Sequence, residues 1–424
     1  MSDDSLYMEL YSKLCGTRTV DSHEHLPSET EALERKMDFY SLFERYCVND
    51  LVAAGASPED MATWQDREKS VTDRWRSFKP YFLATRTTGY SRSVLMVFRD
   101  LLGFDDLSDN TVKPISRALA ENNTPGLYDR LLLDRCNLSA CIDCWHMETQ
   151  GLPDYFYHVA SAHVLVDVHE PEVLSRLRED LDQSIHTLDD LLDVMTCAVA
   201  TWRANPKMVG IKSNHAYKRS LRFEQRDRHE ADAAFNRLLK GKGEALTQHE
   251  AAPLQDYLMF QLFARADAEG LPMVFHTGLQ AGNYGRISDA NPLHLQSVLE
   301  RFPRVKIDLY HGGMPWVRET AILARYFPGV HLNMAWMHII DPAQARSALA
   351  EWLDSVPSTK IFGFGGDYGQ VETVYGHLKL ARQNIARVLT DKVRKGAYSL
   401  SEAEMLVERL MFSNPNEFYG LNLS

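Results

Sequence analysis

Eight short runs rich in Val, Ile, Leu and Phe recur along the 424-residue chain, and most are followed by polar or glycine-rich residues and then by sequence with helical periodicity. This alternation predicts parallel strands joined by helical crossovers. Eight such units favour closure, so we expect an α/β fold of the (β/α)8, or TIM-barrel, type. The predicted strands are Arg18–His25, Leu138–Trp145, His163–His169, Met208–Asn214, Pro272–Thr277, Val305–His311, Val330–Ala335 and Lys360–Gly365.

A long, mostly helical stretch, residues 27–135, separates the first two predicted strands. Segments such as Val71–Phe82 and Ser91–Leu102 carry aromatic and aliphatic residues at helical intervals. The low content of Pro, Gly and Asn and the many aromatic residues favour a packed lobe over a disordered linker. We therefore expect residues 1–424 to form a single barrel domain, with residues 27–135 as a helical insertion after strand 1.

Charge and hydropathy narrow the set of partners. The chain has 58 acidic and 46 basic residues and a net charge of −12, which argues against nucleic acid or an anionic membrane as a partner. No segment approaches the roughly 20 apolar residues of a membrane span, and the N-terminus lacks the basic start of a signal peptide. We expect a cytoplasmic protein.

The first predicted strand ends in His23-Glu24-His25. Residues i and i+2 of a strand point to the same side, so the two imidazoles can meet at one point. Neutral imidazole binds zinc, iron, nickel or manganese when its other nitrogen is held by a partner, and Asp21 is a candidate for that partner. An isolated His-x-His is more often a pair of ordinary strand histidines, so the metal hypothesis depends on the rest of the chain.

Further polar residues stand where other strands end, which is where α/β barrels build their active sites. His276 ends the fifth predicted strand, His311 ends the sixth, and Asp367 follows the eighth. Lys212 lies in the fourth, where an unpaired ammonium group is costly. Any one of these residues could be a satisfied core or loop residue. Their convergence on one face of a barrel is far less probable by chance, so the sequence predicts a metal centre there.

This combination resembles the amidohydrolase superfamily of metal-dependent TIM barrels. The likeness spans nearly the whole chain outside the helical insertion. The segments Gly210–Arg219, His311–Glu319 and Ser413–Tyr419 look like the amidohydrolase-2 branch that contains the nodulin and FluG-type domains and is related to the uronate isomerases.

The resemblance implies that His23, His25, His276 and Asp367 hold one divalent cation, with zinc expected first and manganese or iron as alternatives, and leave a position open for water. Such a metal lowers the pKa of its water toward 7. Asp367 would accept the proton of that water. His311 would act as a neighbouring acid or base, or bind a second metal.

Lys212 has two possible roles under this resemblance. Its carbamylated form would bridge two metal ions, and its free form would contact a substrate carboxylate. A purely structural lysine is disfavoured. The sequence leaves both functional roles open, and with them the choice between one ion and two.

Several residues that follow the strand ends are candidates for substrate binding. Arginine suits bidentate binding of a carboxylate, and surface ion pairing is the alternative for each arginine. His146 and His169, which end the second and third predicted strands, are further candidates, with satisfied loop histidines as the alternative. The candidates after Lys212 and His311 are Tyr217, Arg219, Trp316 and Arg318.

We expect a metal-dependent hydrolase that cleaves an amide, lactone or similar carbonyl bond of a small carboxylate-bearing molecule. One alternative is a nonoxidative decarboxylase of an aromatic or unsaturated acid. Another is a uronate isomerase, because those enzymes also carry a helical insertion after strand 1, although the Lys212 pattern resembles them less. A noncatalytic metal-binding barrel is disfavoured by the intact ligand set. The resemblance also suggests a homo-oligomer whose helical lobe covers the barrel mouth, a neighbour, or both.

Overall fold

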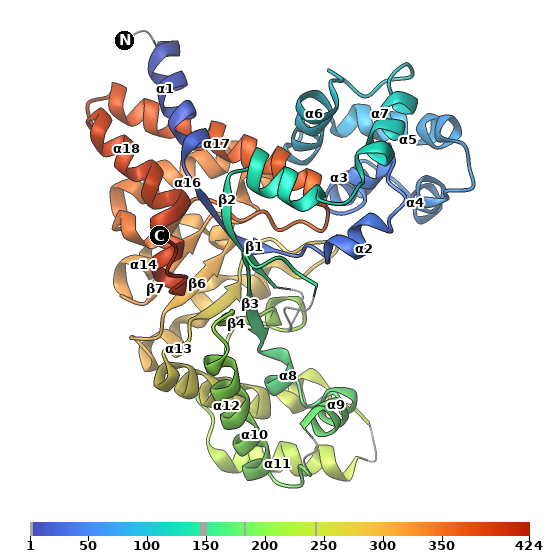
Figure 1. Cartoon of the computed structure of the whole chain (residues 1–424). Helices are drawn as coiled ribbons and strands as arrows, with labels where there is room; N and C mark the ends of the chain where they lie inside the picture. The colour runs from blue at the N-terminus through green and yellow to red at the C-terminus, as the bar shows by residue number, and fades with distance from the viewer. Residues whose placement is uncertain (1–2, 145–150, 182–183, 242–243) are drawn as a thin grey trace.

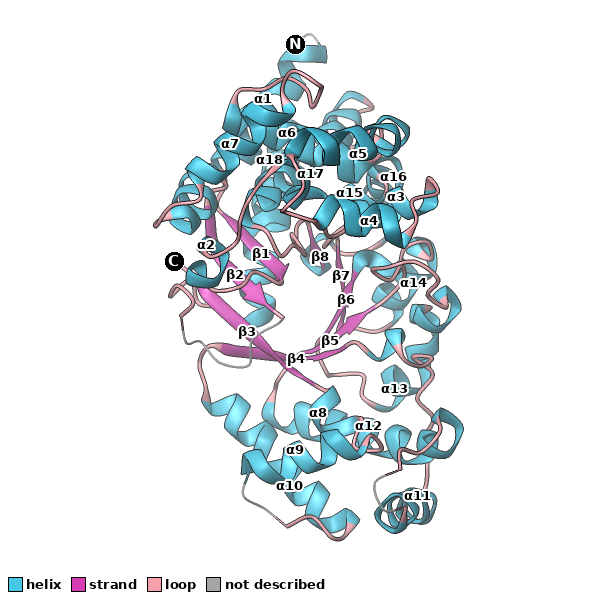
Figure 2. Cartoon of the chain, turned by 90° about the vertical axis from the view of Figure 1, so that its right-hand side faces the viewer, coloured by secondary structure: helices cyan, strands magenta, loops and turns pink. Residues whose placement is uncertain are grey.

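The computed structural model describes residues 3–144, 151–181, 184–241 and 244–424. Eight parallel strands pair in sequence order and form a nearly closed barrel with helices around it (Figures 1 and 2). The predicted (β/α)8 fold is therefore confirmed. The strands are β1 Thr19–Glu24, β2 Leu138–Asp143, β3 Phe156–Ser161, β4 Met208–Ser213, β5 Met273–His276, β6 Ile307–Tyr310, β7 Val330–Asn333 and β8 Ile361–Phe362.

The two ends of the sheet meet along a seam between β1 and the segment after β8. Ser22 N donates to Phe364 O at 3.4 Å, and Asp367 N donates to His23 O at 2.7 Å. The Ser22 hydroxyl also donates to Phe364 O at 2.6 Å. These bonds close the barrel at the C-terminal end of β1, beside the predicted metal ligands.

The third predicted strand, His163–His169, is wrong. The strand of the barrel is Phe156–Ser161, which pairs with β2 and β4, whereas His163–Val166 forms the short helix α8 and His169 lies beyond it. A short apolar run fits a buried strand and a buried helical turn equally well. The other predicted strands overlap the observed ones, although most observed strands are shorter. His146 lies outside the described residues.

The barrel interior is packed, and its N-terminal end is closed by the C-terminal segment of the chain. Lys306, just before β6, donates to Phe418 O at 3.2 Å. Within the barrel, Asp308 Oδ2 accepts from the Tyr419 hydroxyl at 2.5 Å and from Asn333 Nδ2 at 2.8 Å. With that end filled, the opposite end, where the strands finish, is left to form a site. The interior cluster consists of Val20, Ala140, Ile142, Val159, Val209, Val274, Tyr310, Phe362, Phe412, Phe418, Tyr419 and Leu421.

Between β1 and β2 the chain forms a layer of helices at one side of the barrel mouth (Figure 1). The predicted helical segments correspond to α5 and α6. The start of α5 is fixed by Ser70, whose hydroxyl accepts from Asp73 N, and the end of α6 by Gly103 in the left-handed conformation. The elements are α2 Glu29–Leu33, η1 Phe39–Phe43, α3 Cys47–Ala53, α4 Pro58–Gln65, α5 Val71–Thr85, α6 Gly89–Leu102, α7 Val112–Asn122 and η2 Asp129–Arg135.

Helix α6 docks closely on α17, the long helix that follows β8. A Cβ atom on Gly376 of α17 would lie 2.2 Å from the carbonyl oxygen of Ser93 in α6. The Ser93 hydroxyl in turn lies 3.3 Å from the Tyr368 hydroxyl, next to Asp367. This contact joins the inserted helices to the segment that carries a predicted metal ligand.

The remaining helices surround the barrel, and α8–α12 form a group at the side opposite the inserted helices (Figure 1). They are α1 Asp3–Gly16, α8 His163–Val166, α9 Pro171–Leu181, α10 Leu188–Ala204, η3 His215–Tyr217, α11 Arg228–Lys240, α12 Gln248–Glu269, η4 Ile287–Ala290, η5 Pro292–Leu295, α13 Gln296–Arg301, η6 His311–Gly313, α14 Val317–Tyr326, α15 Met337–Ile340, α16 Pro342–Ser355, η7 Ser358–Lys360, α17 Val371–Arg394, α18 Leu400–Glu408, η8 Arg409–Ser413 and α19 Asn414–Tyr419.

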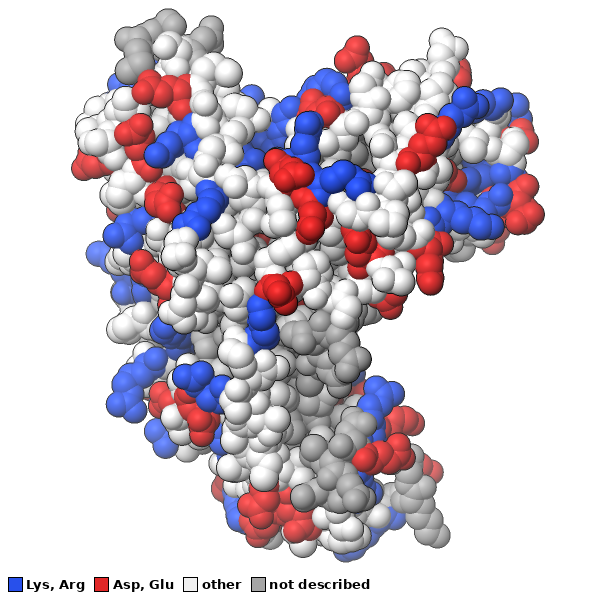
Figure 3. Space-filling model, viewed as in Figure 1, with Lys and Arg blue, Asp and Glu red and all other residues white. Residues whose placement is uncertain are grey.

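Acidic and basic side chains are interspersed over the described residues of the face shown in Figure 3. In the described part of the chain, none of the helices combines the length and the apolar character needed to cross a bilayer.

Candidate metal centre

The two histidines of β1 and the aspartate after β8 form one cluster at the barrel mouth. His23 Nε2 lies 3.4 Å from Asp367 Oδ1, and His25 Nε2 lies 3.3 Å from the same oxygen. The three candidate ligand atoms all lie within 4.8 Å of one another. Four ligands around a cation at bond lengths of about 2 Å stand about 3.3 Å apart. The spacing of these side chains therefore fits a divalent cation.

The protonation states in this cluster also suit a cation. Burial lowers the pKa of His25 and holds the pKa of His23 well below its ordinary value. Both imidazoles are therefore neutral at neutral pH. Burial raises the pKa of Asp367, but the neighbouring imidazoles outweigh it, and the pKa of this carboxyl lies well below its usual range. Neutral imidazoles and an ionised carboxylate are the forms that bind metal.

His276 and His311 face each other beside the cluster. His276 Nε2 contacts Leu279 O at 2.9 Å, and His311 Nδ1 contacts Ala335 O at 3.0 Å, so these nitrogens carry the protons. The other two nitrogens lie only 3.0 Å apart, and His311 Nε2 is 3.7 Å from Asp367 Oδ2. Burial lowers the pKa of both imidazoles, that of His311 to about 4. Two lone pairs therefore point at each other, an arrangement that a cation would relieve.

Lys212 reaches the same cluster from β4. Its Nζ lies 3.2 Å from His23 Nε2 and 5.1 Å from the centre of the Tyr310 ring, and the residue is only 4% exposed. The ammonium group thus contacts the lone pair of His23 that a metal ion would use. This position is compatible with either of the two roles expected from the sequence.

The second nitrogen of His23 is held by a thiol. His23 Nδ1 lies 3.0 Å from Cys144 Sγ, and burial raises the pKa of this thiol to about 12, so it stays protonated. Asp21, the candidate for such a partner in the sequence, does not contact this nitrogen. Its Oδ1 instead accepts from the backbone N–H groups of His23 at 3.2 Å and Gly366 at 2.9 Å, because the carboxylate is turned toward the seam.

Asp21 and Glu24 form a buried acid pair that fixes the turn around Asp367. Asp21 accepts from Gly366 N, and Glu24 Oε2 accepts from Tyr368 N at 2.8 Å. Burial raises the pKa of both, that of Asp21 to about 6. Asp367 has a φ of 59°, a left-handed conformation that is uncommon outside glycine. The hydrogen bonds from Gly366 N and Tyr368 N, on either side of Asp367, hold it in this conformation.

Two residues that the sequence did not single out, in the turn between η1 and α3, also reach this site. The Tyr46 hydroxyl donates to Asp367 Oδ1 at 2.5 Å. The guanidinium carbon of Arg45 lies 5.3 Å from the centre of the Tyr46 ring. Arg45 forms no ion pair with a carboxylate in the described part of the chain. Neither residue carries a sequence signal, because only the docking of the helices brings them to the mouth.

Two pockets open beside the cluster, where the inserted helices meet the barrel loops. One, of about 570 Å³, is lined by residues that include His25, Arg35, Arg45 and Gly369. The other, of about 440 Å³, is lined by residues that include Arg45 and Tyr46. Arg45 therefore borders both pockets, and the larger of the two also reaches the candidate ligand His25.

The predicted substrate-binding residues separate into two groups. The Tyr217 ring lies 4.6 Å from the His276 ring, and its hydroxyl accepts from Ala281 N at 3.0 Å, so it stands at the mouth. The two arginines are engaged elsewhere in the ion pairs Arg219–Asp256 and Arg318–Glu351, each at 2.7 Å. Trp316 precedes α14, where its carbonyl accepts from Thr320 N at 2.9 Å.

A second cluster of metal-binding residue types lies after β3 and β4. His163, Asp167 and His215 each offer one atom within 4.8 Å of the others. However, Asp167 accepts from Gln255 Nε2 at 2.7 Å, and Lys218 Nζ is 3.6 Å from its other oxygen. Protein donors and a nearby ammonium group therefore already satisfy this carboxylate. We interpret the cluster as a structural one that connects the segments after β3 and β4.

The comparisons with known proteins agree with this geometry. The sequence model of the family described as Amidohydrolase matches residues 200–421. This chain belongs to the amidohydrolase family. The matched region includes Lys212, His276, His311 and Asp367. The family is metal-dependent, and the cluster of His23, His25 and Asp367 is the candidate site for its metal.

The protein FluG of Emericella nidulans is 29% identical over 228 residues. That match covers 52% of this chain and 26% of FluG, so the chain corresponds to about a quarter of the relative's length.

Two solved uronate isomerases share the fold over nearly the whole chain. The glucuronate isomerase of Caulobacter crescentus gives a TM-score of 0.79 at 20% identity, and the match covers 100% of this chain and 95% of that one. The uronate isomerase of Thermotoga maritima gives 0.78 at 17% identity, with coverage of 98% and 97%.

Proposed function

We propose that this protein is a metal-dependent hydrolase that cleaves an amide, lactone or similar carbonyl bond of a small carboxylate-bearing molecule. The observation that carries the proposal is the cluster of His23, His25 and Asp367 at the mouth of an amidohydrolase-family barrel, in which both Nε2 atoms lie 3.3–3.4 Å from Asp367 Oδ1. In this proposal His276 completes the ligand set. Zinc is the expected ion, because three imidazoles and one carboxylate form a common zinc donor set.

In this proposal, residues around the cluster accept and donate the protons of the reaction. A bound divalent cation supplies Lewis-acid polarisation and acidifies water. Asp367 is buried and ionised, so its carboxylate can accept the proton of the attacking water. Tyr46 donates to Oδ1 and leaves Oδ2 for that proton. His311 Nε2, 3.7 Å from Oδ2, can pass it to the leaving group.

Arg45 is the proposed contact for the substrate carboxylate. It borders both pockets at the mouth, and no carboxylate in the described residues forms an ion pair with it. Arg35 lines the same 570 Å³ pocket. Guanidinium groups bind carboxylates through two parallel hydrogen bonds. The inserted helices, residues 27–135, thus act in this proposal as a cap that recognises the substrate, which is consistent with a role in excluding water.

The test combines metal analysis with a substrate screen. Protein purified without chelator should contain about one equivalent of divalent metal, or two if Lys212 is carbamylated, and mass spectrometry under native conditions with carbon dioxide should detect that carbamate. Finding no metal would refute the proposal. Lactones, N-acyl amides and γ-glutamyl amides, each with and without a carboxylate, form the screen.

A variant pair then tests the role of Asp367. Asp367→Asn should reduce turnover by a factor of about 10³ or more, since it removes both the ligand charge and the proton acceptor. Asp73→Asn, at the exposed start of α5, is the matched control and should retain activity. Equal activity of Asp367→Asn and wild type would overturn the assignment.

Isomerisation of a uronate is the second candidate, favoured by the whole-chain similarity to two uronate isomerases that includes the inserted helices. Glucuronate and galacturonate therefore belong in the same screen. Interconversion of a uronate with its keto form, without hydrolysis of any carbonyl substrate, would replace the hydrolase proposal by this one.

A further inference from the structure

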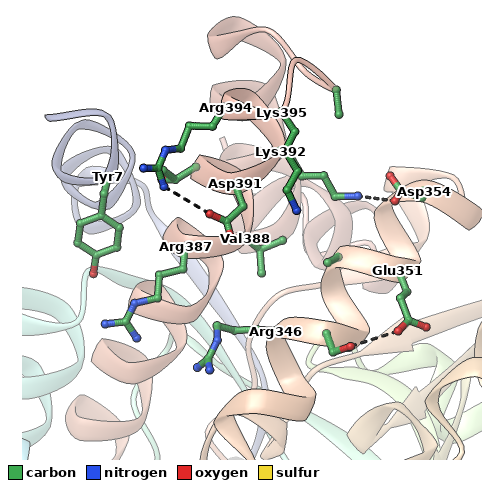
Figure 4. A pocket seen from close by; sticks show the side chains of 14 residues that line it. Tyr7, Arg346, Glu351, Asp354, Arg387, Val388, Asp391, Lys392, Arg394 and Lys395 are labelled. Atoms are coloured by element: carbon green, nitrogen blue, oxygen red, sulfur yellow. Dashed lines mark hydrogen bonds and ion pairs between the residues drawn. The ribbon is translucent and has the colours of Figure 1, made fainter. Parts of the chain in front are cut away.

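A separate pocket, of about 830 Å³, lies on the outer surface of the barrel between α16, the C-terminal half of α17 and α1 (Figure 4). Residue 387 follows the start of α17 by 16 residues, which corresponds to about 24 Å of helix. Because α17 begins just after Asp367, at the mouth, this pocket is separate from the candidate metal centre.

The acidic side chains of the pocket are neutralised by their own partners. Asp354 forms an ion pair with Lys392 at 2.5 Å, and Asp391 lies 3.7 Å from Arg394. Glu351 is held by Arg318 at 2.7 Å. None of these carboxylates is therefore available to the remaining cations of the pocket.

Two arginines of the pocket have no carboxylate partner among the described residues. Among the described residues, neither Arg346 of α16 nor Arg387 of α17 forms an ion pair with a carboxylate. Arg346 Nη1 donates to Asn384 at 2.9 Å, which orients its guanidinium group. Figure 4 shows the side chains of Arg346 and Arg387 converging on the same part of the pocket, with the Tyr7 hydroxyl beside Arg387.

The positive charges of the pocket act on one another. Burial lowers the pKa of the Arg346 guanidinium, and the positive charges of Arg387 and of Arg92, from α6, lower it further, against an opposing effect of Asp341. Like charges held close together repel one another, and a multiply charged anion would reduce that repulsion. The whole chain carries a net charge of −12, so the excess of positive charge is local to this pocket.

A further cation lines the pocket. Lys395 forms no ion pair with a carboxylate in the described chain. Guanidinium and ammonium groups bind phosphate oxygens through charge-assisted hydrogen bonds.

We propose that this pocket binds a compact anion with at least two negative charges, namely free phosphate or the phosphate group of a small metabolite, through Arg346 and Arg387. The site is independent of the proposed hydrolase chemistry. A flat acidic protein surface would fit less well, because the two guanidinium groups converge within a hollow rather than spread over a face.

The test is calorimetric titration of the full chain with inorganic pyrophosphate, orthophosphate and glucose 6-phosphate at about 150 mM salt. Dissociation constants in the millimolar range or below are expected. The double variant Arg346→Gln/Arg387→Gln should weaken binding at least tenfold. The control variant Arg304→Gln removes one positive charge at a side chain that is 86% exposed and does not line the pocket, and should bind like wild type.

The ligand arms and the variants give distinct outcomes. Tighter binding of glucose 6-phosphate than of orthophosphate would assign the site to a phosphorylated metabolite, and the reverse order would assign it to free phosphate. The proposal is overturned if wild type binds none of the three anions, or if the double variant binds as wild type does. A change of oligomeric state in the double variant without any anion binding would also overturn it, in favour of a contact between copies.

Discussion

Gly376 of α17 gives a sharp test of how the inserted helices are attached to the barrel. Replacing it by alanine introduces a Cβ atom that would lie 2.2 Å from Ser93 O, 2.9 Å from Ser93 C and 3.1 Å from Val97 Cγ2. A carbon and a carbonyl oxygen in contact normally stand about 3.3 Å apart. The backbone of α6 must therefore retreat by about 1 Å.

Two opposing effects determine the outcome. Alanine is favoured over glycine inside a helix by up to about 1 kcal/mol. Forcing a methyl group into a filled contact costs about 1–3 kcal/mol. The clash involves backbone atoms, which cannot rotate away as a side chain end could, so the cost should prevail. We expect Gly376→Ala to lower the free energy of unfolding by about 1–2 kcal/mol.

Urea denaturation followed by tryptophan fluorescence measures this change, and Gly16→Ala is the matched control. Gly16 also lies in a helix, but its added Cβ atom meets nothing within 4 Å, so this variant should be as stable as wild type or more so. Hydrogen exchange should show the loss of protection concentrated in α6. A Gly376→Ala protein as stable as Gly16→Ala would refute the proposed close contact.

Three further predictions concern charge and metal. Asp38→Ala should cost about 3–5 kcal/mol of stability, measured by urea denaturation, because it leaves the guanidinium of Arg74, which is 1% exposed, without its buried carboxylate partner. Burial raises the pKa of Asp308 to about 7. The folded state therefore holds this proton more tightly than the unfolded chain does. The free energy of unfolding should fall by up to about 1.4 kcal/mol per pH unit as the pH rises from about 4 to 7, and should then level off. Melting curves should show a weaker fall for Asp308→Asn, and an identical fall would contradict the assignment. Zinc added to chelator-treated protein at 100 times its dissociation constant should raise the unfolding free energy by about 2.7 kcal/mol, and the gain should largely disappear in Asp367→Asn.

The barrel was predictable from the sequence because its strands are locally encoded. The apolar runs that end in His25, His276 and His311 combine strand composition with a polar end, and all three strands form where expected. The run at His163–Val166 has a similar composition but forms a helix. Pairing of Phe156–Ser161 with both neighbouring strands decides that case, and pairing is a tertiary property that periodicity does not contain.

The candidate site was predictable to the same extent. Alternation along β1 places His23 and His25 on one side, and barrel closure brings Asp367 to them. Tyr46 and Cys144 were not predicted, because their contacts depend on how the inserted helices dock and on the packing of β2 against β1. Those contacts join residues far apart in the sequence, and no local pattern marks them.

The seam between β1 and the segment after β8 has a consequence for the order in which parts of this protein form. Glu24 and Tyr368, which hold the turn of Asp367, are 344 residues apart. During synthesis His23 and His25 leave the ribosome long before the aspartate that completes their cluster. In the proposed site, a metal ion would therefore gain its full ligand set only after the last strand has closed the barrel. Tight metal binding should consequently mark finished molecules, and nascent chains that stop before residue 367 should bind the ion weakly.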